Sequence, residues 1–188
     1  KALELALGYI KQGALTLEDV VNHLYHANMT TNDVFDYLFT NTWEQLDENA
    51  RSLLLATAFF VDSASNEALG AGADLQGYRL EMGLGQLNDS SFLNGDDQAL
   101  RYSLHPLVRA FANAKLQGVP DWERQGREQW LTWYKKEAVL ALDSANYSHL
   151  RYEMLNLLSL LEWLALQKRM ADLAWFFQHL ERLLFAEG

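Results

Sequence analysis

His105 is the residue of this chain whose type and position best suit a chemical role. It follows the short run Tyr102–Leu104, which predicts a strand, and it precedes Pro106. Proline suits the first position of a helix, because the N–H that it lacks would be unpaired there. An imidazole at a helix start can contact an anion, and it can equally cap the helix through a local hydrogen bond. The residues alone leave both roles open.

The other candidates for chemistry are weaker. Arg109 follows one helical turn after His105, and we expect an ordinary exposed helix charge there. His23 and His26 are three residues apart and could both contact a metal, but the sequence supplies no obvious third or fourth ligand. The carboxylates fall at helix starts and on outer faces, where they offset the helix dipole. We therefore predict no catalytic residue, no metal site and no enzymatic activity for this chain.

Composition limits the classes of partner and location. The formal net charge is −10 and the isoelectric point is about 4.9, which opposes a general affinity for phosphate backbones. Cysteine is absent, and no apolar run approaches the roughly 20 residues that span a bilayer. The chain starts at Lys1 and carries no phosphate-binding glycine-rich motif. We expect a cytoplasmic piece of a longer protein.

The periodicity predicts a mainly α-helical fold with three segments. Helices over residues 2–11 and 16–24 would complete a helical domain over residues 1–30. Residues 31–118 would form a winged-helix domain, and residues 119–188 would begin a tetratricopeptide-like antiparallel array. The array would consist of a helix that opens at Pro120 and of helices over residues 147–166 and 170–185.

The winged-helix prediction rests on element order. Asp47 and Ser65 suit the N-caps of two helices, the second of them ending at the Gly70–Gly72 pair, and a further helix is expected over residues 77–87. Strands over residues 91–93 and 99–104, with a turn over 94–97, would form the wing. The helix after Pro106 would close the domain.

The expected third helix of this domain argues against DNA as a partner. Recognition helices present Arg, Lys, Asn or Gln to the bases and further cations to the phosphates. Residues 77–87 contain a single arginine, Arg79, with Glu81 nearby. A DNA-binding transcription regulator with a helical dimerisation or ligand domain remains the alternative function, and a plain helical scaffold for a protein partner is a third.

Several segments together resemble the winged-helix region of bacterial NB-ARC-type STAND NTPases, which are relatives of plant resistance proteins and apoptosome ATPases. The resemblance covers most of the chain. It is carried by Asp33–Leu38, Trp43–Glu48, Ala50–Ala56 and Leu104–Ala112, while Leu155–Leu157 and Leu161–Leu164 resemble the start of the tetratricopeptide-like array that follows in the family.

The resemblance implies a regulatory part of a signalling ATPase rather than an enzyme. The Met-His-Asp motif of the family falls on Leu104, His105 and Pro106, so that Met is replaced by Leu and Asp by Pro. By resemblance, His105 would contact the β-phosphate of ADP in the parent protein and help to hold its inactive state. The parent would bind ADP or ATP with Mg²⁺ through a domain upstream of Lys1. The implied partners are that nucleotide-binding domain, a protein or ligand on the array, and other copies on activation, with no membrane.

Overall fold

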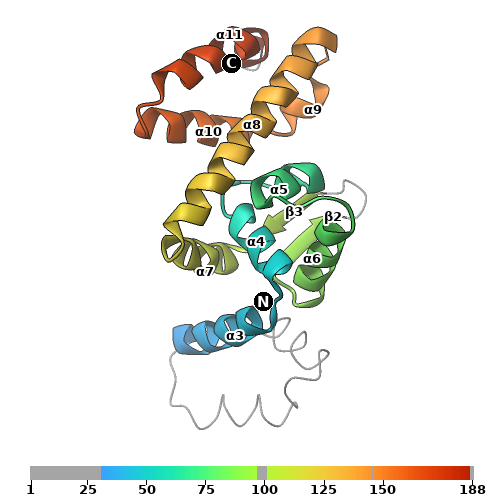
Figure 1. The fold of residues 1–188 in the computed structure, drawn as a ribbon, viewed down its shortest axis with the longest axis vertical. Coiled ribbons are helices and arrows are strands. Elements are labelled where there is room, and N and C mark those ends of the chain that lie inside the picture. Colours follow the sequence, from blue (N-terminus) through green and yellow to red (C-terminus); the bar gives the residue numbers. More distant parts are fainter. Residues whose placement is uncertain (1–30, 97–100, 145, 187–188) are drawn as a thin grey trace.

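The computed structural model describes residues 31–96, 101–144 and 146–186. The described chain is mainly helical and carries one small antiparallel sheet, as the sequence predicts (Figure 1). In chain order the elements are α3 (Thr31–Gln45), α4 (Glu48–Thr57), β1 (Ala64–Ser65), α5 (Asn66–Ala73), α6 (Gly77–Asp89), β2 (Leu93–Asp96), β3 (Arg101–Leu104), α7 (Pro106–Gln117), α8 (Pro120–Ser144), α9 (Ser148–Arg151), α10 (Met154–Leu166) and α11 (Met170–Ala186).

Helix α4 lies at the centre of the first half of the fold. Asp47 caps it as predicted, since the carboxylate accepts a hydrogen bond of 2.8 Å from the amide of Ala50. Leu53 and Leu54 are fully buried. Helix α6 packs closely against α4 at Gly83, where an added Cβ would lie 2.6 Å from Leu53 Cδ1. The glycine that weakens α6 as an isolated helix therefore permits this contact.

The three strands form a sheet of order β1-β3-β2, with both pairings antiparallel. The predicted hairpin is confirmed, but its bounds differ. Asn94 to Asp96 extend β2, whereas the sequence placed them in the turn. The two-residue strand β1 was missed, because a segment of that length has no measurable periodicity and exists through its pairing of Ala64 with Tyr102.

Helix α5 differs from its prediction at the C-terminal end. Ser65 caps it as expected, but the helix continues through Gly70 and Gly72 to Ala73 and stops at Asp74, which takes the left-handed conformation at φ 57°. At Gly70 an added Cβ would lie 2.6 Å from the carbonyl oxygen of Leu75. That glycine serves the close return of the chain after the helix rather than the helix end.

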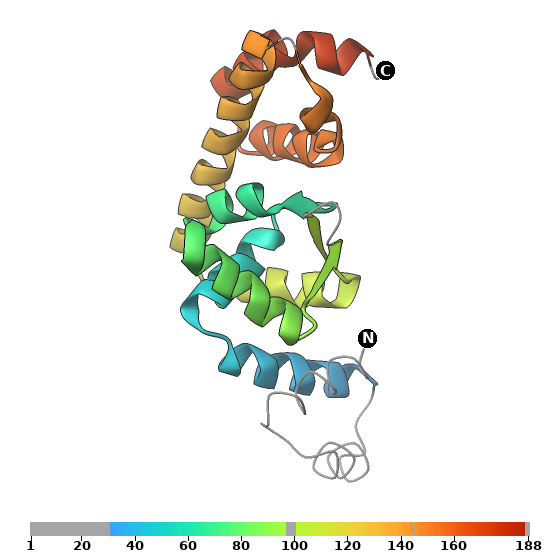
Figure 2. The ribbon, with the colours of Figure 1, turned by 90° about the vertical axis from the view of Figure 1, so that its right-hand side faces the viewer.

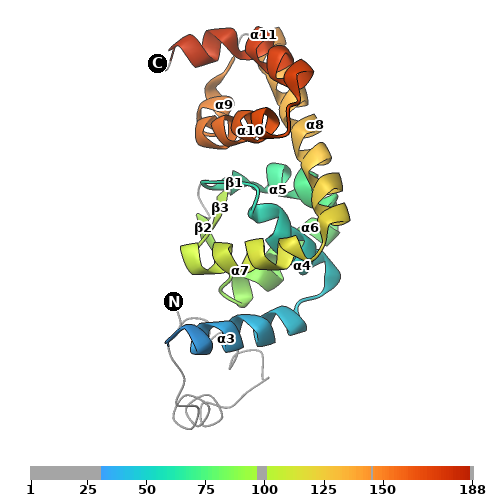
Figure 3. The same cartoon turned by 90° about the vertical axis from the view of Figure 1, so that its left-hand side faces the viewer.

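Helix α8 joins the two halves of the molecule. It runs along one side from α7 to the end that holds α9 and α11, and α10 lies between α11 and the sheet (Figure 3). Trp130 of α8 is fully buried against Phe59 and Phe60, with ring centroids 5.9 and 5.7 Å apart. One continuous hydrophobic core therefore extends from α3 to α11.

The helix predicted over residues 147–166 is two helices in the structure. Helix α9 ends at Arg151 and α10 begins at Met154, and the residue between them that precedes α10 is Glu153, which is only 3% exposed. The break coincides with the inward turn of this carboxylate. The helix predicted to open at Pro120 and the helix predicted over 170–185 are confirmed, and the first of them extends to Ser144.

The order α4, β1, α5, α6, β2, β3 is compatible with a winged-helix domain. The helices predicted over residues 2–11 and 16–24 lie outside the described residues. Within the part of the chain that is described, no helix combines the length and the apolar character needed to cross a membrane.

Candidate functional site at the strand-to-helix corner

Strand β3 and helix α7 hold His105 at the junction between them. Leu104, the last residue of β3, is 6% exposed and pairs with Leu93 of β2. His105 is the N-cap residue of α7, and its carbonyl oxygen accepts the first helical hydrogen bond from the amide of Arg109 at 2.9 Å. Pro106 occupies the first helical position, as predicted. The sheet and the helix thus fix the backbone on both sides of the imidazole.

The imidazole of His105 caps the helix with one nitrogen. Its Nδ1 accepts a hydrogen bond of 3.3 Å from the amide of Leu107. This bond assigns the ring proton to Nε2 in the neutral form. The described residues supply no hydrogen-bond partner for Nε2, and the side chain is half-buried. Capping and anion contact, which the sequence left as alternatives, therefore use different nitrogens and are compatible.

Arg109 is not the exposed charge that the sequence predicted. Its side chain is half-buried and donates a hydrogen bond to the carbonyl oxygen of Phe60, at the end of the segment that follows α4. Burial lowers the pKa of Arg109, and the nearby Asp62 carboxylate partly offsets this effect. The guanidinium connects α7 to the segment between α4 and β1, since it donates to a carbonyl oxygen that lies outside any helix.

Helix α6 runs across the near side of the molecule in Figure 2. Its exposed side chains include an aromatic, an apolar and a basic residue. Tyr78 is 74% exposed and Met82 is 48% exposed. Arg79 donates from Nε and Nη2 to the side-chain oxygen of Asn49, at 3.1 and 2.9 Å. Gln86 holds the other end of the helix, since its side chain accepts from the amide of Asp47 at 3.0 Å. The face is firmly positioned by α4 and by the residues before it.

A buried polar cluster, which we call the Glu153 network, joins β3 to the helical array. Arg101 Nη1 lies 2.6 Å from the Glu153 carboxylate, and the same guanidinium donates to the hydroxyl and carbonyl oxygens of Ser63 at 2.9 and 2.6 Å. The other members are Tyr134 of α8 and Asn156 of α10, both fully buried. Each donates to Glu153 Oε2, at 2.7 and 2.8 Å respectively.

Sequence reasoning missed the Glu153 network. The pKa of Tyr134 is raised well above its ordinary value, first by burial and then by the adjacent Glu153 carboxylate. The sequence offered no clear signal, because Glu153 stands between the mostly polar run Ser148–Tyr152 and the mainly apolar helix α10. The pairing with Arg101 had no local signature. The network places the array in direct contact with the strand that leads to His105.

The pair His23 and His26, considered above as a weak metal site, lies outside the described residues. Across residues 31–96, 101–144 and 146–186, no three His, Asp or Glu side chains gather as a metal-binding group.

Comparison with known proteins gives one informative similarity. No family model matches the sequence. The chain is 22% identical over 178 residues to the transcription activator GutR of Bacillus subtilis strain 168. This match covers 87% of the chain and 22% of GutR, so the chain spans about a fifth of that protein's length. The prediction that argued against DNA as a partner was wrong in the light of this similarity. It rested on the net negative charge of the chain and on the few cations of residues 77–87, whereas the match extends over 87% of the chain.

Proposed function

We propose that this chain is a regulatory segment of a transcription regulator. The observation that carries the proposal is the similarity to a transcription activator over 87% of the chain. The element order from α4 to β3 supports it, because a winged helix is a common DNA-binding unit. This function is the alternative that the sequence left open. It is favoured over a plain helical scaffold, because the similarity found is to a transcription activator.

In this proposal α6 and the β2–β3 wing form the side of the chain that meets DNA. Tyr78, Arg79 and Met82 project from α6, and Arg79 is positioned by Asn49 for a contact with a phosphate or a base edge. The helical array of α8 to α11 would serve as the ligand or dimerisation part. The segment itself would bind and relay rather than catalyse.

A salt titration of DNA binding tests the proposal. Full-length protein is mixed with labelled duplex DNA from the region directly upstream of its own coding sequence, and the affinity is measured by fluorescence anisotropy at increasing salt. The affinity should fall steeply with salt, and Arg79→Ala should weaken binding and lower the salt slope by about one. Arg124→Ala is the matched control, because Arg124 is a surface residue, 74% exposed, in an ion pair with Asp121 on α8. Absence of salt-dependent binding, or equal effects of the two variants, would contradict the proposal.

The geometry of His105 favours a second, compatible function, a nucleotide-dependent control of that regulator. We infer that in the full-length protein His105 contacts the phosphate of bound ADP, as the resemblance to NB-ARC-type STAND NTPases implies. The supporting observation is that capping occupies Nδ1 and leaves the Nε2–H as a donor beside a helix start, which suits a phosphate oxygen. ATP, ADP and Mg²⁺ would bind a domain elsewhere in the parent. A ligand that contacts His105 in one conformation shifts the equilibrium toward that conformation.

A further inference from the structure

Two cavities open along the seam between α5 and α8, and they share Leu75 as a wall. Their volumes are about 200 and 370 Å³. On α8 the first is lined by residues from Trp122 to Gln129, and the second by residues from Trp133 to Glu137, on successive turns of the same helix face. Together they form one elongated surface, which we call the α8 groove.

Two glycines set the depth of the groove at its first cavity. An added Cβ at Gly126 of α8 would lie 2.8 Å from the carbonyl oxygen of Gly72 in α5. The two helices therefore approach more closely than side chains would allow. Because neither glycine has a side chain, the space beside this contact stays unfilled and forms part of the first cavity.

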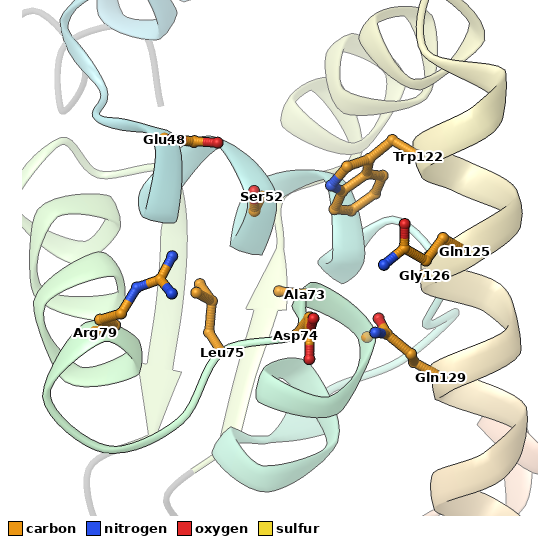
Figure 4. A pocket seen from close by; sticks show the side chains of 11 residues that line it. Glu48, Ser52, Ala73, Asp74, Leu75, Arg79, Trp122, Gln125, Gly126 and Gln129 are labelled. Carbon is orange, nitrogen blue, oxygen red and sulfur yellow. The ribbon is translucent and has the colours of Figure 1, made fainter.

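The first cavity is polar (Figure 4). Side chains from four helices surround a common opening, with Ser52 from α4, Arg79 from α6, Gln125 and Gln129 from α8, and Asp74 at the end of α5. Glutamine side chains offer both a donor and an acceptor, as peptide groups do. Two of them, one turn apart on α8, can pair with the backbone of an extended peptide.

The charge of the groove favours a cation. Glu48 and Asp74 line the first cavity, and neither carboxylate forms an ion pair within residues 31–96, 101–144 and 146–186. Arg79, the basic residue of that cavity, already donates to Asn49. The second cavity is lined by Glu67, Glu137 and one lysine, Lys136, and Glu137 also lies 3.2 Å from His149 Nε2 outside the cavity lining. Carboxylates thus outnumber basic groups in both cavities.

The second cavity is mainly apolar. Its walls include Ala71, Leu75, Leu80 and the indole of Trp133, with the charged residues at the rim. Such a cavity suits one aliphatic or aromatic side chain, because burial against these walls removes apolar surface from water.

We propose that the α8 groove binds an extended peptide segment of a protein partner, with an apolar side chain in the Leu80–Trp133 cavity and a Lys or Arg near Asp74. The cavity centres on α8 are about nine residues apart, which is about 13 Å at the helical rise. An extended chain covers that distance in about four residues. The apolar and the basic residue of the partner are therefore about four positions apart. Arg79 lines the first cavity and also carries the DNA contact proposed above. Asp74 and Ala71, on which the peptide proposal is tested, take no part in that DNA contact, so the two proposals can fail separately.

Selection of binding peptides from a random library tests this inference. A displayed library of nine-residue peptides is selected on the immobilised chain at physiological salt. Enriched peptides should share an apolar residue and a Lys or Arg about four positions apart. An enriched peptide is then labelled, and its affinity is measured by fluorescence anisotropy. Replacement of its basic residue by Gln should lower the affinity at least fivefold.

Two variants of the chain should show the matching losses. Asp74→Asn removes the carboxylate, and asparagine readily adopts the left-handed conformation that Asp74 has. Ala71→Phe fills the apolar cavity while it leaves the buried core side chains in place. Each should weaken the selected peptide at least fivefold with an unchanged circular dichroism spectrum. Glu162→Gln, an equal charge change on the exposed side of α10, should have no effect.

Three outcomes would overturn the proposal. The first is a selection that enriches no peptide class or an acidic one. The second is binding that survives both Asp74→Asn and Ala71→Phe, which would place the peptide elsewhere. The third is an equal loss of peptide affinity in Glu162→Gln. That result would mean that the general negative charge of the chain, rather than Asp74, accounts for binding.

Discussion

Arg101 Nη1 lies 2.6 Å from the carboxylate of Glu153, and the two side chains are 16% and 3% exposed. Arg101 begins β3, the strand that ends directly before His105, while Glu153 precedes α10 of the helical array. A displacement of the array relative to β3 would separate two charges that water does not reach freely. The Glu153 network therefore couples the array mechanically to the corner that holds His105.

Removal of the carboxylate should be costly. Glu153→Gln would leave the partly buried Arg101 without its counter-charge, and we expect the free energy of unfolding to fall by about 3 kcal/mol. Urea denaturation followed by circular dichroism measures this change. A loss no larger than that of the exposed control Glu162→Gln would show that the pair contributes little.

The double variant Arg101→Met with Glu153→Leu should lose less stability than the sum of the single variants. It leaves neither charge buried alone, and apolar replacements of buried ion pairs are often nearly neutral. The double-mutant cycle from the same denaturation curves gives the interaction energy. Strict additivity would mean that the two side chains do not interact.

Tyr134 should make the stability fall at alkaline pH. Its pKa is raised in the folded chain, above all by burial. The unfolded chain then loses this proton first, at about pH 10. The stabilisation is complete below that pH and is lost as the pH rises through the higher folded pKa. Urea denaturation between pH 8 and 11 should show a smaller alkaline decline in Tyr134→Phe than in the unmodified chain, and equal declines would contradict this assignment.

Two glycines of α6 should respond in opposite directions to alanine. At Gly83 the new Cβ would meet Leu53 Cδ1 at 2.6 Å, so Gly83→Ala should destabilise by about 1–3 kcal/mol. At Gly85 nothing lies within 4 Å of the new Cβ, so Gly85→Ala should stabilise by about 0.5–1 kcal/mol through helix propensity. Thermal unfolding of both variants checks the pair. A gain at Gly83 would mean that α4 and α6 are not in close contact.

His105 variants should separate capping from the proposed phosphate contact. His105→Ala removes both, and it should cost about 1 kcal/mol through the lost cap. His105→Asn keeps an acceptor for the Leu107 amide and removes the ring N–H. In the full-length protein both variants should release labelled ADP faster, whereas only the alanine variant should be less stable. An unchanged release rate in both would argue against the nucleotide contact, whatever their stability.

The sequence by itself determined the helical elements and their caps. Asp47, Ser65 and Pro106 begin their helices where the pattern predicts, because capping depends on residues within one turn. The apolar periodicity likewise predicted the helices of the array, apart from the break between α9 and α10. These features can be predicted from the sequence because each depends on residues that are close together in the chain.

Only the tertiary structure decided which distant residues meet. The strand β1, the bond from Arg109 to Phe60, the Glu153 network and the α8 groove each join segments far apart in the chain. The apolar periodicity of the sequence does not predict such pairings, because they depend on how the helices pack against one another. His105 depends on both kinds of information. Its position directly before a helix follows from the sequence. Only the folded structure shows that Nδ1 caps the helix and that Nε2 is left as a donor.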